Sequence, residues 1–180
     1  MDQPADQRRQ RLIQALCKSD SLRRNARADR IEWLSLHTNR PSFIAGRAET
    51  LQLLQEAHDT FVDGHFAGTL MIAMAVIEHC VVEHLQLRRL TQGSPTFAQA
   101  VRLATETKLF PPDWLARATR LSHRRNPFAH LKDENHPHSL GARVQSEDRH
   151  PRAIMEEDAK DALELMSNIF IATLREWPLD

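Results

Sequence analysis

The sequence contains no tyrosine, little cysteine and few of the residues that form turns. Its 180 residues include only 5 glycines and 9 prolines, too few for the many short hairpins of a β-sandwich or β-barrel. The two cysteines, Cys17 and Cys80, are far apart in the chain, which suits neither a disulfide framework nor a cysteine-based zinc site. We therefore expect both to be buried thiols.

The sequence also lacks a net charge and a long hydrophobic run. The 24 Lys and Arg residues offset the 24 Asp and Glu residues, so net charge does not point to nucleic acid. The N-terminus has no apolar core of signal-peptide length, and the most apolar stretch, residues 70–82, is interrupted by Glu78 and His79. These features predict a soluble cytoplasmic protein without a membrane partner.

Helix-forming residues dominate what is present. There are 22 leucines and 21 alanines, against 24 residues of valine, isoleucine and threonine together. Leucine and alanine favour helices, whereas β-branched residues favour strands. The composition and length therefore predict an all-α protein with one main domain.

The N-terminal part is basic. Helical spacing of apolar residues predicts helices over 7–18 and 25–37. Residues 1–30 hold eight Lys and Arg residues against four Asp, and the stretch 38–46 is typical of a connection. We infer a basic helical appendage over 1–45 and a helical bundle over 46–180. The arginines of the appendage serve either to bind RNA or to form a solvated or partner-binding face.

Apolar residues recur at helical spacing through the bundle. The segment from Leu70 to Leu85 is apolar nearly all round, which indicates the central helix. Further helices are expected to start at Ser94-Pro95, near Pro112-Asp113, and to run from about Ile154 to Trp177. Residues 131–152 show almost no apolar periodicity, which predicts a mobile loop beside a functional site.

Arginines accumulate in residues 117–130, and no acidic residue lies between Asp113 and Asp133. Arg117, Arg120 and Arg124 share one helical face by their spacing, where they concentrate positive potential. Arg125 follows the apolar side of the same helix. An arginine on that side needs a partner or a ligand.

Pro127 predicts a break in this helix, because proline disfavours helical geometry at the preceding residue. The helix should end near Arg125, with Asn126 as the N-cap and Pro127 as the first residue of a new helix. His130 would then lie one turn into that helix. Arg125 and His130 would converge near a helix N-terminus whose free N–H groups suit a phosphate.

The stretch RNPFAH, residues 125–130, resembles the R-x(4–6)-H motif of HEPN domains in its Arg-Asn-x-x-x-His form. Residues 93–130 look like the helix, short turn and helix that lead into this motif in many members. Residues 73–85, AMAVIEHCVVEHL, look like the family's central helix. The resemblance covers roughly residues 47–177 and leaves out the N-terminal 45 residues.

The resemblance implies an up-and-down helical bundle, commonly a homodimer, in which two motifs face each other in a metal-independent endoribonuclease site that needs no cofactor. His130 would act as general base or acid, Arg125 would stabilise the transition state, and Asn126 would hold the geometry. The products would carry 2′,3′-cyclic phosphate and 5′-OH ends. Some toxin members have a tyrosine two residues after the histidine, where this chain has Lys132, so regulation through that tyrosine is not expected.

Two readings of the site remain open. In the first, the chain is a ribonuclease of a toxin–antitoxin or phage-defence system, with RNA as substrate and an antitoxin as a protein partner. In the second, the motif is structural and the chain is a non-catalytic module that binds nucleotide, RNA or protein. Glu78 either orients Arg125 or His130, or faces solvent. The candidate phosphate-binding residues are Arg117, Arg120, Arg124 and Lys132.

The remaining histidines do not form a standard metal-ligand pattern. His136 and His138 are expected to be solvated loop residues. The group His79, Cys80 and His84 is expected to pack in the central helix. We therefore predict no metal site.

Overall fold

The computed structural model describes residues 3–38 and 46–174, and all regular structure in these residues is helical. This confirms the all-α prediction. The helices are α1 (Gln3–His37), α2 (Ala48–Asp63), α3 (Phe66–Leu87), α4 (Phe97–Glu106), α5 (Pro112–Ala129), α6 (Leu140–Glu147) and α7 (Pro151–Leu174).

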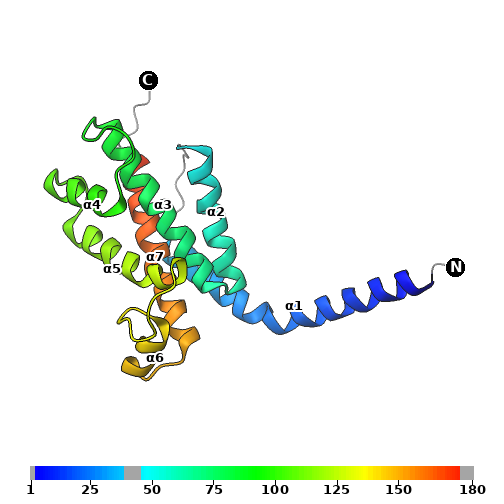
Figure 1. The fold of residues 1–180 in the computed structure, drawn as a ribbon. Helices are drawn as coiled ribbons and strands as arrows, with labels where there is room; N and C mark the ends of the chain where they lie inside the picture. The colour runs from blue at the N-terminus through cyan, green and yellow to red at the C-terminus, as the bar shows by residue number, and fades with distance from the viewer. Residues whose placement is uncertain (1–2, 39–45, 175–180) are drawn as a thin grey trace.

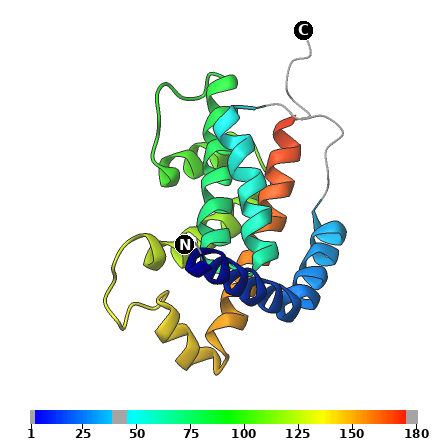
Figure 2. The same ribbon diagram turned by 90° about the vertical axis from the view of Figure 1, so that its right-hand side faces the viewer.

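Helix α3 is the centre of the bundle, as its sequence predicts. It packs against α2, α4, α5 and α7, and Figures 1 and 2 show these helices arranged around it. Leu70, Met74, Ile77 and Leu85 of α3 are fully buried among the apolar side chains of α7. Burial of such side chains contributes about 1.5–3 kcal/mol each, so α3 and α7 supply much of the stability of the bundle.

Helix α3 is also the only described helix that is long and apolar enough to cross a membrane. Half of its apolar window is buried inside the bundle, and the helix carries Glu78, His79 and Glu83. Burial in the bundle therefore accounts for much of its apolar composition.

The N-terminal segment differs from the two predicted helices. The residues 19–24 that were expected to separate them continue as helix, so α1 is one helix of 35 residues. Residues 19–24 contain neither glycine nor proline, and nothing in them forces a break. Figure 1 shows the first half of α1 projecting away from the bundle.

The cysteines separate into two environments. Cys80 is buried in α3, where desolvation raises the pKa of its thiol to about 12 and leaves it unreactive. Cys17 lies on the projecting half of α1 and is exposed, so the expectation of a buried thiol is wrong there. Local spacing places Cys17 beside apolar residues, but no other element covers them.

Helix boundaries agree in part with the prediction. Helix α5 starts at Pro112 as expected, whereas α4 starts at Phe97 because Thr96, not Ser94, is its N-cap. Thr96 and Gln99 form a capping box, which satisfies two backbone donors at once. The last helix begins at Pro151 and is described to Leu174, so the predicted end at Trp177 lies outside the described residues.

The segment expected to be an unstructured loop contains a further helix. Ser139 caps α6 by accepting a hydrogen bond from the backbone N–H of Ala142. This short helix packs on α7. An arginine of α6, and not an apolar side chain, holds this helix to the bundle, as described below. The sequence of α6 therefore shows no apolar face.

Candidate functional site

Arg125 and Glu78 meet on the surface between α5 and α3. The Arg125 Nη2 atom lies 3.8 Å from the Glu78 Oε2 atom, and the two side chains are 21% and 35% exposed. The guanidinium Nε atom is buried and has no hydrogen-bond partner among the described residues. The arginine on the apolar side of α5 therefore has the partner that its position requires, but its donors are only partly used.

The rest of the motif does not form the predicted helix N-terminus. Helix α5 continues through Asn126 and Pro127 to Ala129, and His130 is its C-cap in an extended conformation. The backbone N–H of His130 donates to the carbonyl of Asn126 at 2.9 Å. Asn126 is thus not an N-cap, and this position offers a helix C-terminus instead of the N–H groups expected to bind phosphate.

A reason for this continuation lies in the position of Pro127. Only two helical residues follow Pro127, so the single backbone hydrogen bond that its missing N–H removes is at the C-terminal end of α5. Phe128 in that last turn packs against the core. His130 and Lys132 beyond it are exposed, and no hydrogen bond or ion pair of the His130 ring is formed with the described residues.

The three arginines on the other face of α5 point to acidic residues of α7. Arg117 donates to Asp161 and, at 2.5 Å, to Glu164, while Arg120 lies 3.7 Å from Asp161. Burial lowers the pKa of Arg117, but hydrogen bonding to Glu164 and the charge of Asp161 raise it overall. These pairs use much of the positive charge that the sequence assigns to phosphate binding.

Arg124 belongs to a buried ion-pair cluster. Asp158 of α7 is 1% exposed and accepts a hydrogen bond from Arg124 at 2.7 Å and from both terminal nitrogens of Arg143. Arg143 lies on α6 and also donates to Glu147. The cluster therefore fastens α6, and the segment that follows His130, to α5 and α7.

Sequence patterns contain a signal for this arrangement. Asp158, Asp161 and Glu164 recur every three residues along α7, as Arg117, Arg120 and Arg124 do at spacings of three and four along α5. Two such complementary stripes fit side by side on antiparallel helices. Arg143 could not be found in this way, because its segment shows no helical periodicity.

Three histidine rings gather beside the ion-pair cluster. The ring centroids of His123 and His138 are 5.3 Å apart, and those of His136 and His138 are 5.7 Å apart. Desolvation, the two neighbouring histidines and the charges of Arg124 and Arg143 lower the pKa of His138. The folded protein therefore favours the neutral form of this ring.

We expect this histidine to make the protein less stable in mild acid. A group with a lowered pKa in the folded state binds its proton more readily in the unfolded chain, so stability falls as the pH drops below the ordinary value of about 6.5. The variant His138→Gln should lose less thermal stability than the wild type between pH 7 and pH 5. Melting curves across this range test the effect, and equal losses in both proteins would contradict it.

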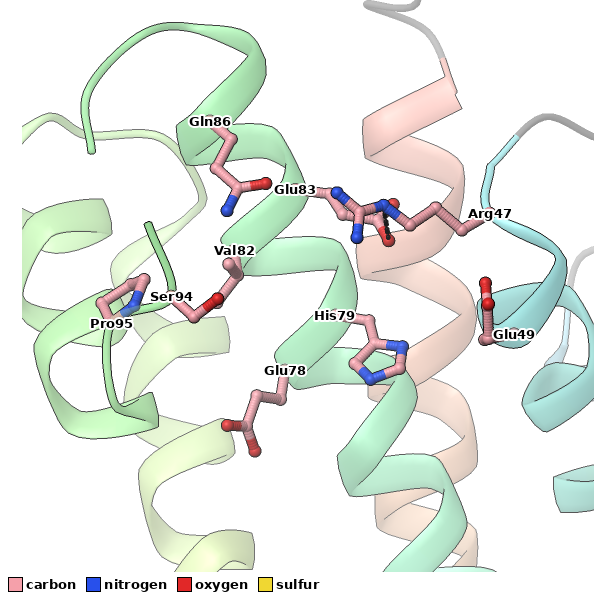
Figure 3. A pocket seen from close by; sticks show the side chains of 9 residues that line it. All are labelled: Arg47, Glu49, Glu78, His79, Val82, Glu83, Gln86, Ser94 and Pro95. Carbon is pink, nitrogen blue, oxygen red and sulfur yellow. Dashed lines mark ion pairs between the residues drawn. The ribbon is translucent and has the colours of Figure 1, made fainter. Parts of the chain in front are cut away.

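A groove borders the Arg125–Glu78 pair along the outer face of α3. It has a volume of about 390 Å³, and Figure 3 shows the side chains that line it. His79 points from α3 toward Glu49, whereas Glu78 points to the other side. The lining residues are Arg47, Glu49, Glu78, His79, Val82, Glu83, Gln86, Ser94 and Pro95.

Hydrogen bonds fix one wall of this groove. The Thr50 hydroxyl lies 3.1 Å from His79 Nδ1 and donates to Glu83 at 3.2 Å, and Arg47 pairs with Glu83 at 3.5 Å. Apart from Glu78, these residues are absent from the sequence-based candidates. Arg47 and Thr50 lie at the start of α2 and Glu83 lies on α3, so only the packing of these two helices brings them together.

The described residues contain no group of three or more His, Cys, Asp or Glu side chains that could hold a metal ion. His84 is buried beside the ring of Phe110, with Cys80 one turn earlier in the same core. Packing of these two residues in the central helix agrees with the sequence-based expectation.

Comparison of the chain with models of known protein families, with curated proteins and with solved structures gives no match. The similarity of residues 125–130 to the HEPN motif remains an interpretation of the sequence. Function must therefore be argued from the chemistry of the residues themselves.

Proposed function

We propose that the chain is a metal-independent endoribonuclease of the HEPN type. The observation that carries the proposal is the state of Arg125. Its guanidinium has one long contact with Glu78 and a buried Nε atom without a described partner. A buried donor without a partner costs about 1–3 kcal/mol, and such a group calls for an explanation such as a ligand.

Other arginines of α5 differ from Arg125. Arg117 and Arg124 make short hydrogen bonds to carboxylates, so their donors are already engaged. Arg125 keeps terminal N–H groups for a phosphate, and Glu78 holds the guanidinium in place from the central helix. A guanidinium is suited to stabilise the additional negative charge that develops on phosphorus during RNA cleavage.

His130 supplies the second group. It lies five residues after Arg125 at the open end of α5, and its ring is exposed. A neutral imidazole there can take the proton from the ribose 2′-OH, and its protonated form can give a proton to the leaving 5′ oxygen. The 2′ oxygen then bonds to phosphorus as the bond to the 5′ oxygen breaks, which yields a 2′,3′-cyclic phosphate and a 5′-OH end.

The test is cleavage of a mixed-sequence RNA in the presence of EDTA, with analysis of the product ends. We expect cyclic-phosphate ends from the wild type and a loss of at least about 10²-fold in rate for Arg125→Ala, as for other groups that stabilise transition-state charge. The matched control is Arg102→Ala, because Arg102 is exposed on α4 and its only described ion pair, with Glu106, spans 4.0 Å. Cleavage that EDTA abolishes, or that survives in Arg125→Ala, would overturn the proposal.

A non-catalytic binding module is the second candidate. The observation that favours it is the exposed His130 ring, which no described side chain orients. In this case neither wild type nor variants would cleave RNA, while Arg120→Ala and Lys132→Ala, at two exposed basic residues, would weaken RNA binding and its dependence on salt. A cytoplasmic location, a role in toxin–antitoxin or defence systems, and an antitoxin partner belong to the first proposal and stay predictions.

A further inference from the structure

The projecting half of α1 has no partner in the described chain. We call residues 6–26 the arm. Leu12, Ile13, Leu16 and Leu22 of the arm are 49–77% exposed. Figures 1 and 2 show that the arm leaves the bundle and extends into solvent. Leu12 and Leu16, one turn apart on this lone helix, indicate a face that is covered in the functional assembly.

The second half of α1 shows what such a face contacts. Arg27 pairs with Asp63 of α2 at 3.2 Å, and Arg30, which is 7% exposed, donates to the carbonyl of Val62 at 2.9 Å. Leu34 packs against the apolar core. This half thus docks on the end of α2 through a mixture of arginine and apolar contacts.

The same face continues into the arm. Steps of three, four and seven residues lead from Leu34, Arg30 and Arg27 back to Arg23, Leu16 and Leu12, and such steps keep residues on one side of a helix. The arm therefore carries the same mixture of arginine and leucine on this face as the docked half, but no surface of its own bundle lies against it.

The charge of the arm indicates which molecule covers its exposed face. The arm carries six basic residues and two acidic ones, so in a chain of zero net charge the remainder has an excess of four negative charges. Two arms would repel each other. The arm and the remainder of a second copy attract each other.

A matching surface is present on α2. Gln52, Gln55, Glu56 and Asp59 form an exposed row at helical spacing that ends at Asp63, and we call this row the α2 stripe. Helix α2 contains neither lysine nor arginine. The carboxylates of Glu56 and Asp59 have the neutral amides of Gln52 and Gln55 as their described partners, and no described cation pairs with them.

Apolar side chains border the α2 stripe. Leu51 and Val62 are half-buried and lie along one side of the stripe. Leu51 is four residues before Gln55, and Val62 is three residues after Asp59. They offer Leu12 and Leu16 an apolar counterpart. The arm thus fits the α2 stripe in both charge and apolar character.

We propose that the arm of each copy docks along the α2 stripe of a second copy, in a reciprocal dimer. This continues an interface that the chain already makes, since Arg27 and Asp63 pair at the end of the same stripe. The arm is roughly 32 Å long and α2 is roughly 24 Å long, so each docked arm covers a strip of about 24 Å by 10 Å. Two arms then bury on the order of 1,000 Å² in total, the size of a weak, reversible interface.

Charge reversal tests the proposal in the full chain by light scattering and sedimentation. We expect the wild type to dimerise at micromolar concentration and to dissociate as salt rises. The arm variant Arg9→Glu/Arg23→Glu and the stripe variant Glu56→Lys/Asp59→Lys should each weaken dimerisation at least about tenfold, because like charges then face each other. The matched control is Glu106→Lys/Asp113→Lys, which changes exposed acids far from α2 and should dimerise as the wild type does.

Mixing the two charge-reversed variants gives the decisive result. In the mixed dimer, the acidic arm meets the basic stripe, and the native arm meets the native stripe. The one-to-one dimer should therefore form with an affinity near that of the wild type. Failure of the mixture to dimerise would overturn the proposal.

A second pair of variants tests the apolar contact. Leu12→Ser/Leu16→Ser should weaken the dimer, whereas Leu22→Ser/Leu36→Ser, on another face of α1, should not. A wild type that is monomeric at 100 micromolar, or a dimer that no variant affects, contradicts the proposal. So does a loss of RNA binding in the arm variant without any change in oligomeric state, which would assign the arm to RNA.

Discussion

Replacement of His130 by alanine should reduce the rate of RNA cleavage by about 10²–10⁴-fold, the range for loss of a general acid or base. The fold should not change, because His130 is an exposed C-cap and its backbone hydrogen bond to Asn126 does not need the ring. The measurement is a single-turnover cleavage assay with EDTA present, together with circular dichroism of both proteins.

The matched control for this variant is His65→Ala. His65 is also exposed, and it precedes α3, about 20 Å along that helix from Glu78. The control should cleave as the wild type does. Wild-type rates in His130→Ala would remove this histidine from the mechanism, even if the ribonuclease activity itself were established.

The core of the bundle was predictable because the spacing of apolar residues in the sequence indicates which of them are buried. Leu70, Ile77 and Leu85 recur at helical spacing in a segment that is apolar nearly all round, and such a segment has few alternatives to the centre of a helical bundle. Ala118 and Leu121, which are buried, mark the inner side of α5, and their spacing in the sequence is that of one helical face. From that side it followed that Arg125 needs a partner.

The prediction that the motif lies at a helix N-terminus is wrong, because a local backbone preference competes with tertiary packing. Proline at position 127 disfavours helix at Asn126, which predicted a break and a new helix. In the structure the last turn of α5 is retained while Phe128 contacts the core. Packing of an aromatic side chain can outweigh the preference of the residue before a proline for a non-helical backbone.

The helix within residues 131–150 could not be predicted from the sequence for a different reason. Its structure depends on one polar residue, Arg143, and on a carboxylate that is 15 residues further along the chain. A single arginine that anchors a short helix in this way leaves no periodic signal in the sequence of that helix. Asp158 of α7 has a partner on each of two other helices, Arg124 of α5 and Arg143 of α6.

Replacement of Asp158 by alanine should therefore destabilise the protein by about 3–5 kcal/mol, the usual cost of removing one partner from a buried ion pair. The variant leaves the guanidinium of Arg143, which is 8% exposed, and that of Arg124 without their shared carboxylate. Since domains of this kind are stable by about 5–15 kcal/mol, the midpoint of urea unfolding should shift strongly. Asp158→Asn should lose much of the same stability, because the amide keeps the shape but not the charge.

The adjacent residue provides the control for Asp158. The Glu157 side chain is 60% exposed and pairs with Arg149 at 2.6 Å on the surface, so Glu157→Ala should change stability by less than about 1 kcal/mol. The double variant Asp158→Ala/Arg143→Ala should cost less than the sum of the two single variants, because the second change removes the charge that the first leaves unpaired. Additive losses, or a loss in Asp158→Ala as small as in Glu157→Ala, would mean that the cluster does not fasten α6 to the bundle.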